Sequence, residues 1–189
     1  MTDRQNIWTV SKVLEATGGR LVFGDNRAPI RGISTDSRSV KEGELFVAIS
    51  GPRHDGHDFV QSAFQKDALA VLVSEDHTAS ESADAAKGRC WIAVPDTLKA
   101  LGDLAAFRRR QSKASVVAIT GTNGKTTTKE MTAAVLGKAF SVLKTPGNFN
   151  NLIGLPLSLF RLEEDHEWAV LELAMNHPGE IGRLATICK

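Results

Sequence analysis

Residues 116–128, VVAITGTNGKTTT, decide the fold. The stretch from Val116 to Thr120 is apolar until its end, which is typical of a strand buried on both faces of a parallel sheet. A turn with two glycines follows, and a helix is expected from Lys125 to about Lys138. A strand, a glycine turn and a helix in this order predict a phosphate-binding loop, because N–H groups of the turn and of the helix N-terminus face the anion.

The residues of this loop suit that task individually. Glycine at 121 and 124 lets the backbone approach a phosphate closely. Lys125 is expected to reach the β and γ phosphates of a nucleoside triphosphate, and Thr126 to offer its hydroxyl to Mg²⁺. The expected phosphate-binding residues are Gly121, Thr122, Asn123, Gly124, Lys125, Thr126 and Thr127.

One position departs from the common pattern G-x-x-x-x-G-K-[ST], which would place a glycine where this sequence has Ile119. The loop is therefore of the shorter GxxGK type. An ordinary βα turn is the alternative interpretation, but it does not explain the run Lys125-Thr126-Thr127.

A carboxylate follows in VLELAMNH, where the apolar strand Trp168 to Leu173 contains Glu172 near its end. A carboxylate at the end of a neighbouring buried strand is the usual second holder of Mg²⁺. Burying an unpaired charge at a strand end costs free energy, so a cationic partner for Glu172 is expected. The alternative is a solvated glutamate at a strand end.

The order of elements around the loop predicts the fold class. An apolar stripe after Asp96, a strand at 141–143, a helical piece at 152–160 and a helix at 179–188 complete a βαβαβ pattern. Such a pattern predicts an α/β fold with a doubly wound parallel sheet over residues 97–189.

The preceding residues 1–96 read differently, with short strands and few helices, and predict a small mixed α/β domain. A helix is expected at 8–19, ended by two glycines. Residues 75–88 are polar and alanine-rich, as in a surface segment. The expected strands and the second helical stretch are at 20–23, 32–35, 45–49, 70–73 and 91–94, and at 59–66.

Composition excludes several classes of protein. Of the 189 residues, 42% are hydrophobic and the net charge is +1, which is far too weak to argue for nucleic acid. No run of 18 apolar residues or signal-peptide pattern occurs, so we expect a soluble, cytoplasmic protein without membrane insertion. Cys90 and Cys188 lack the spacing of a zinc site or a disulfide framework. The cluster from Arg108 to Arg110 ends a helical pattern, where cations complement the helix dipole.

Four stretches together make the pattern specific: VVAITGTNGKTTTKEM, TPGNFNNLIGLPLSL, VLELAMNHPGEI and ISTDSRSVKEGELFVAISGPRHDGHDF. They resemble the ATP-dependent Mur ligases of peptidoglycan synthesis, over essentially the whole chain. The NFNNLIGLP and ELAMNHPGEI runs are most similar to the branch that adds D-alanyl-D-alanine to UDP-N-acetylmuramoyl-tripeptide. The TDSR and DGHDF motifs are shared with the ligases that add the third peptide residue, which stay an alternative.

The resemblance implies a three-domain enzyme. Residues 1–96 match the domain that holds the UDP end of the substrate, and residues 97–189 match the opening part of the domain that holds ATP. The family's metal-binding histidine, its carbamylated lysine and the third domain would lie beyond Lys189. We therefore expect a monomeric fragment that does not ligate alone.

The chemistry implied by the resemblance is the transfer of the γ-phosphoryl of ATP to a peptide carboxylate, followed by attack of an amine on the acyl phosphate. Lys125 and Glu172 would be the catalytic residues, with Lys125 and Mg²⁺ neutralising charge during transfer. Thr126 and Glu172 would hold the metal. The substrate-binding residues implied are Thr35, Asp36, Ser37, Arg38, Asn148, Asn151, Asn176 and His177.

Several of these residues also have structural interpretations. Asp36 could simply shape a turn, the three asparagines of TPGNFNN are common in turns, and His177 could be a structural hydrogen-bonding residue. At the level of the molecule, a nucleotide-binding module without catalysis is the alternative to a ligase. A general P-loop kinase would leave TDSR and DGHDF unexplained, and folylpolyglutamate synthetase lacks an amino-terminal domain of this type.

Overall fold

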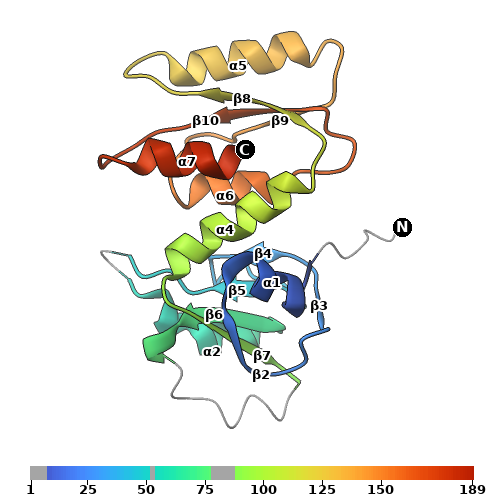
Figure 1. Ribbon diagram of the computed structural model, residues 1–189, viewed down its shortest axis with the longest axis vertical. Helices are drawn as coiled ribbons and strands as arrows, with labels where there is room; N and C mark the ends of the chain where they lie inside the picture. The colour runs from blue at the N-terminus through green and yellow to red at the C-terminus, as the bar shows by residue number, and fades with distance from the viewer. Residues whose placement is uncertain (1–7, 52–53, 78–87) are drawn as a thin grey trace. The chain divides into compact units, whose positions relative to one another are not determined.

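The computed structural model describes residues 8–51, 54–77 and 88–189. The chain forms two compact units, Met1–Leu101 and Gly102–Lys189 (Figure 1). Among the described residues, no helix combines the length and the hydropathy that a membrane crossing requires.

The first unit is built on a five-stranded sheet, and a mixed α/β arrangement is confirmed. The strand order is β2-β7-β6-β5-β4, with β2 antiparallel to β7 and the other neighbours parallel. Buried aromatic residues, Phe46, Phe64 and Trp91, lie at the centre of its core. The strands are β2 (Arg20–Phe23), β4 (Ile33–Ser34), β5 (Leu45–Val47), β6 (Ala70–Ser74) and β7 (Cys90–Val94).

The start of the first unit differs from the expected helix at 8–19. The helix α1 covers only Val10–Thr17, because Thr9 is extended and its side chain caps the helix, and Gly18 ends it with φ +66°. The two residues before it form β1 (Trp8–Thr9), which pairs antiparallel with β3 (Pro29–Ile30). A two-residue pair between distant segments leaves no periodic signal, so the sequence pattern missed both strands.

Within the described part of the first unit there are three further short helical segments: η1 (Gly56–Phe59), α2 (Val60–Gln65) and η2 (Glu75–His77). Helix α2 lies within the expected helical stretch. Most of the expected surface segment at 75–88 falls on residues 78–87, which lie outside the described residues, as do residues 52–53 of the motif that ends in DGHDF.

The second unit confirms the doubly wound parallel sheet. Its three parallel strands, in the order β8-β10-β9, are β8 (Ser115–Ile119), β10 (Trp168–Glu172) and β9 (Val142–Lys144). Helix α5 (Lys125–Leu136) lies on one face, and α6 (Gly154–Leu159) and α7 (Glu180–Cys188) lie on the other (Figure 1). Helix α4 (Thr97–Arg110) crosses the division between the units, and its Ala105 and Ala106 join the core beneath α6 and α7.

Strand β8 is not buried on both faces, contrary to the sequence-based expectation. Ser115 and Ala118 are exposed, whereas β10 is buried from Ala169 onward. The physical reason is position: among the described strands β8 pairs with β10 alone and forms an edge, and only β10 has a neighbour on each side. An apolar run therefore predicted the strand but not its place in the sheet.

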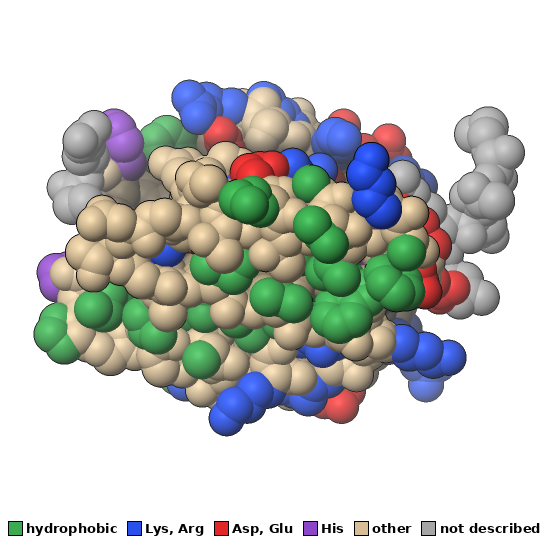
Figure 2. All heavy atoms as spheres, turned by 90° about the horizontal axis from the view of Figure 1, so that it is seen from above, with side chains coloured by type: hydrophobic (Ala, Val, Ile, Leu, Met, Phe, Trp, Pro, Cys, Tyr) green, Lys and Arg blue, Asp and Glu red, His purple; other side chains and the backbone are tan. Residues whose placement is uncertain are grey.

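Helix α5 carries apolar side chains on the face that is turned away from the sheet. Figure 2 views the molecule from the side on which α5 lies in Figure 1, and hydrophobic side chains are spread over that face. On α5 the large exposed ones are Met131 and Val135, with 65% and 73% of their surface accessible. The side turned to the sheet instead buries Ala133 and a lysine, Lys129.

Both cysteines are buried and free. Burial raises the pKa of the Cys188 thiol to about 11, because the charged thiolate would lose its hydration. The thiol therefore stays protonated at neutral pH. The arginine cluster also contributes to packing, since Arg109 Nε donates to the carbonyl of Cys188 at 3.2 Å.

Candidate functional site

The GTNGKTT loop joins the end of β8 to the first residue of α5. Residues 121–124 are exposed, and Gly124 is the N-cap of α5 with φ +76°. A side chain at this position would be strained, because L-residues other than glycine rarely adopt positive φ. No side chain of the described residues caps the helix at Gly124, so its first N–H groups remain available to an anion.

Lys125 folds back over the loop that precedes it. Its Nζ donates to the carbonyl of Gly121 at 2.7 Å and lies 3.4 Å from the carbonyl of Thr122. Thr126 and Thr127 follow on the first turn of α5 and are exposed. The loop therefore combines an ammonium group, helix N–H groups and two hydroxyls on one exposed turn, which suits a polyphosphate.

Glu172 lies beside the strand end from which this loop begins. In the parallel register of β8 and β10 it is opposite Ile119, and only 2% of its surface is exposed. Its Oε1 accepts a hydrogen bond from Asn150 Nδ2 at 2.7 Å, and its N–H donates to Thr145 Oγ1 at 3.0 Å. The alternative of a solvated strand-end glutamate is therefore wrong.

The expected cation partner of Glu172 is Lys129, a residue that sequence reasoning did not single out. Lys129 is fully buried, and its Nζ is 3.9 Å from Glu172 Oε2. Lys129 follows Lys125 by four residues, but this spacing does not distinguish a buried lysine from an exposed one, so the sequence alone could not identify it. Thr145 and Asn150 were missed as well, because hydrogen bonds between distant segments leave no local pattern.

A divalent cation fits the donors at this edge of the sheet. Oε2 of Glu172 is buried without a hydrogen bond, which is an uncommon and costly state for a carboxylate oxygen. Hard cations such as Mg²⁺ take carboxylate and hydroxyl oxygens, usually together with phosphate oxygens and water. Glu172 offers the first kind of oxygen, and Thr126 on the first turn of α5 offers the second.

The asparagine-rich loop lies against the segment that follows β10. The N–H of Ala174 donates to the carbonyl of Asn150 at 2.8 Å, so the two segments meet at the carboxyl edge of the sheet. Asn151 has a structural task, because its Oδ1 accepts from the N–H groups of Ile153 and Gly154 at the start of α6. Asn148 is exposed.

The side chains of Asn176 and His177 are also exposed. Their backbone N–H groups donate to Glu180 Oε2 at 2.7 and 3.3 Å, and these bonds lower the pKa of the Glu180 carboxyl. The loop before α7 is thus held by its backbone. Its polar side chains are left directed to solvent, where a ligand could be contacted.

In the first unit, the TDSR motif forms a turn closed by a charge pair. Asp36 Oδ1 accepts from the backbone N–H and from Nε of Arg38, both at 2.9 Å, and the Arg38 side chain lowers the pKa of Asp36 to about 2. The turn-shaping role of Asp36 is therefore real. Arg38 is 88% exposed and available to an anion, Thr35 is half-buried, and Ser37 is buried.

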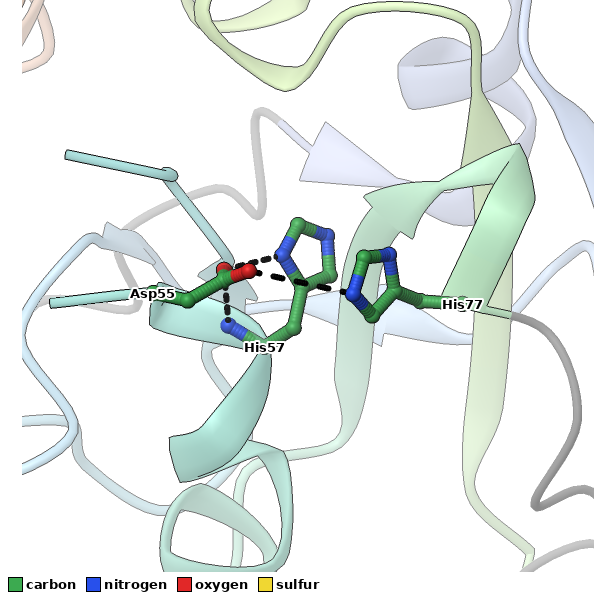
Figure 3. Close-up of side chains that lie close together, drawn as sticks. All are labelled: Asp55, His57 and His77. Atoms are coloured by element: carbon green, nitrogen blue, oxygen red, sulfur yellow. Dashed lines mark hydrogen bonds and ion pairs between the residues drawn. The ribbon is translucent and has the colours of Figure 1, made fainter.

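The DGHDF motif places Asp55 and His57 beside His77, as Figure 3 shows. His57 Nδ1 is 2.5 Å from Asp55 Oδ1, and the rings of His57 and His77 stack with centroids 3.8 Å apart. Three such ligand groups could in principle hold a metal ion. However, His57 Nε2 accepts a hydrogen bond from the Ser74 N–H, so its proton is on Nδ1 and neither nitrogen is free for a metal.

The parallel sheet, the exposed glycine loop before α5 and the buried carboxylate on the adjacent strand are the features typical of P-loop nucleotide-binding α/β proteins. Models of known protein families match two segments of the chain. The Mur ligase family catalytic domain matches residues 29–109, and the Mur ligase middle domain matches residues 119–189. The chain belongs to the Mur ligase family.

Individual relatives agree with the family. A UDP-N-acetylmuramoyl-tripeptide--D-alanyl-D-alanine ligase of Treponema pallidum is 45% identical over 174 residues, which are 90% of this chain and 38% of the relative. A crystal structure of MurF from Acinetobacter baumannii has a TM-score of 0.85 at 36% identity, covering 96% of this chain and 39% of that one. MurF ligase from Thermotoga maritima, in complex with ADP, has a TM-score of 0.73 at 37% identity, covering 82% and 35%. The chain thus spans less than two fifths of these relatives' lengths.

Proposed function

We propose that the protein containing this chain is an ATP-dependent ligase that adds D-alanyl-D-alanine to UDP-N-acetylmuramoyl-tripeptide in the cytoplasm. The observation that carries the proposal is the GTNGKTT loop with Glu172 in register beside its first strand. Relatives that are named for this activity support the choice of substrates. The third-residue ligases are the alternative within the family, and substrate preference separates the two.

In the proposed reaction the peptide carboxylate attacks the γ-phosphorus of ATP, ADP leaves, and the amine of D-alanyl-D-alanine displaces phosphate from the acyl phosphate. Lys125 is the residue of this chain that neutralises charge on the γ-phosphoryl oxygens. It would exchange its present contacts with the Gly121 and Thr122 carbonyls for phosphate oxygens. The helix N-terminus at Gly124 binds and orients the phosphate chain.

Thr126 and Glu172 would hold Mg²⁺, which would neutralise negative charge on the phosphates when bound. The substrate residues divide between the units. In residues 1–96 we assign the UDP end of the substrate to Thr35, Asp36, Ser37 and Arg38, with the exposed guanidinium of Arg38 as the main anionic contact. In residues 97–189 we assign Asn148, Asn151, Asn176 and His177 to substrate or phosphate contacts. We further propose that the protein acts as a monomer.

Lys125→Ala in the full-length gene product tests this proposal. We expect ATP-dependent phosphate release in the presence of both substrates to fall by about a thousandfold, since a charge that stabilises the transferring group is lost. Circular dichroism and melting temperature should stay unchanged, because Lys125 bonds only exposed loop carbonyls. The matched control is Lys138→Ala, which removes an exposed lysine after the same helix. Retained turnover in Lys125→Ala would remove the loop from the mechanism, and wild-type protein without substrate-dependent turnover would favour a non-catalytic module.

A further inference from the structure

A fully buried lysine connects three elements beside the candidate metal ligand. Lys129 Nζ donates to the carbonyl of Thr145 at 3.0 Å and to the carbonyl of Gly147 at 3.2 Å, and Glu130 Oε1 lies 3.1 Å away. These three acceptors match the three N–H bonds of an ammonium group. A buried lysine is rare unless it is paired, so its position calls for a specific reason.

Lys129 places a positive charge near the Glu172 carboxylate but does not donate a hydrogen bond to it. The distance of 3.9 Å between Nζ and Oε2 is within ion-pair range, yet too long for a hydrogen bond. Oε1 is already held by Asn150, whereas Oε2 is buried and accepts no hydrogen bond from the described residues. A lysine that bonded Oε2 directly would block that oxygen.

Lys129 also fixes the loop that orients Glu172. The loop begins at Thr145, whose hydroxyl accepts the Glu172 N–H, and it carries Asn150, whose side chain bonds Oε1. Lys129 holds the same loop through the carbonyls of Thr145 and Gly147. One ammonium group thus sets both the charge next to the carboxylate and the position of the two residues that hold it.

We propose that Lys129 is a positioning residue that places a compensating positive charge beside Glu172 and holds the loop that aims this carboxylate at a divalent cation, and so couples nucleotide binding to Mg²⁺. This rests on the proposed function. Among the described residues, the polar contacts of the Lys129 ammonium group are to Thr145, Gly147, Glu130 and Glu172, and none is to a side chain of the phosphate loop. Its effect should therefore appear in the magnesium dependence of nucleotide affinity rather than in affinity as such.

Lys129→Gln tests the role, because glutamine keeps hydrogen-bond donors for the two loop carbonyls but removes the charge. A non-hydrolysable ATP analogue is titrated calorimetrically into the full-length gene product, once in EDTA and once in excess Mg²⁺. We expect affinity in EDTA within about threefold of wild type, and a loss of about tenfold or more in the enhancement by Mg²⁺. Lys144→Gln is the matched control, since Lys144 is half-exposed, also pairs with Glu130 and should leave the enhancement intact.

The outcomes separate this inference from the proposed function. Lys125→Ala in the same titration should lose affinity in both buffers; if it binds as wild type does, the proposed function fails. If Lys125→Ala weakens binding but Lys129→Gln keeps the full magnesium enhancement, the role of Lys129 alone is overturned. If Lys129→Gln loses affinity for the ATP analogue equally in EDTA and in Mg²⁺, the proposal is also overturned, because such a loss would indicate only a structural role. It is likewise overturned if the affinity of the wild-type protein does not depend on Mg²⁺.

If Lys129→Gln does not fold, Lys129→Arg decides the question. A guanidinium preserves the charge beside Glu172 and can donate to the loop carbonyls. The proposal then requires the magnesium enhancement to survive. A folded Lys129→Arg protein without the enhancement overturns it.

Discussion

At the scale of single residues, Asp55 shows how one carboxylate organises a motif. It caps η1 by accepting the His57 N–H at 3.0 Å, and it also accepts from Ser50 Oγ at 2.9 Å and from His57 Nδ1. The bonds from His57 are the main cause of a low pKa for Asp55, about 2 against an ordinary 3.8. Because folding lowers this pKa, Asp55 stabilises the folded state only while it is ionised.

The pH dependence of that contribution can be predicted with its sign. It is fully present above about pH 5 and is lost as pH falls through the unfolded pKa of 3.8 toward the folded pKa of about 2. We expect Asp55→Asn to lower the free energy of unfolding at pH 7 by about 1 kcal/mol or less, because the pair is partly exposed to solvent. The difference from wild type should vanish near pH 2. Urea unfolding across this range measures it, with the exposed Asp58→Asn as control; a difference that is constant with pH would contradict the assignment.

At the scale of elements, the start of α5 depends on backbone conformation rather than on packing. Gly124 has φ +76°, and a Cβ there would meet nothing within 4 Å. Gly124→Ala should therefore destabilise by about 1–2 kcal/mol through backbone strain alone. Gly182 in α7 also has open space around it but a helical backbone, so Gly182→Ala should stabilise by about 0.5–1 kcal/mol. Thermal unfolding of the two variants checks the contrast, and equal effects would refute it.

The same elements show what sequence could and could not predict. The strands and helices around the phosphate loop follow from composition and periodicity, and the expected second-unit elements are present. The pairing of Trp8–Thr9 with Pro29–Ile30 was missed, because it depends on contacts between distant segments. The edge position of β8 was missed for the same reason.

The residues of the candidate site also fall into those that the sequence could predict and those that it could not. Lys125, Thr126 and Glu172 could be named from local patterns, since each occupies a fixed place relative to a strand end. Lys129, Thr145 and Asn150 could not, because each is defined by a partner far away in the chain: 16 residues separate Lys129 from Thr145, and 22 separate Asn150 from Glu172. The GTNGKTT motif therefore predicted the phosphate loop, whereas only the folded structure shows which residues surround the Glu172 carboxylate.

At the scale of the whole molecule, the two units carry different parts of the proposed task. The second unit presents the phosphate loop, whereas the first presents the TDSR turn and the exposed Arg38. The TDSR turn does not distinguish a D-alanyl-D-alanine ligase from a ligase that adds the third peptide residue, because the TDSR motif is common to both. The discriminating chemistry lies in the acceptor: the first kind of ligase needs a UDP-linked tripeptide, and the second a UDP-linked dipeptide.

The melting temperature of the full-length gene product should therefore respond to the two acceptors differently. A ligand that binds only the folded state stabilises it by RT ln(1 + [L]/Kd), so the shift grows with affinity at a fixed concentration. At equal concentrations we expect UDP-N-acetylmuramoyl-tripeptide to raise the melting temperature by several degrees, and the dipeptide form to raise it about half as much or less. Arg38→Ala should reduce both shifts together, because the UDP part is shared, whereas the exposed Arg161→Ala should reduce neither. A larger shift with the dipeptide would instead assign the protein to the third-residue ligases, since an acceptor lacking the third residue is the one they extend.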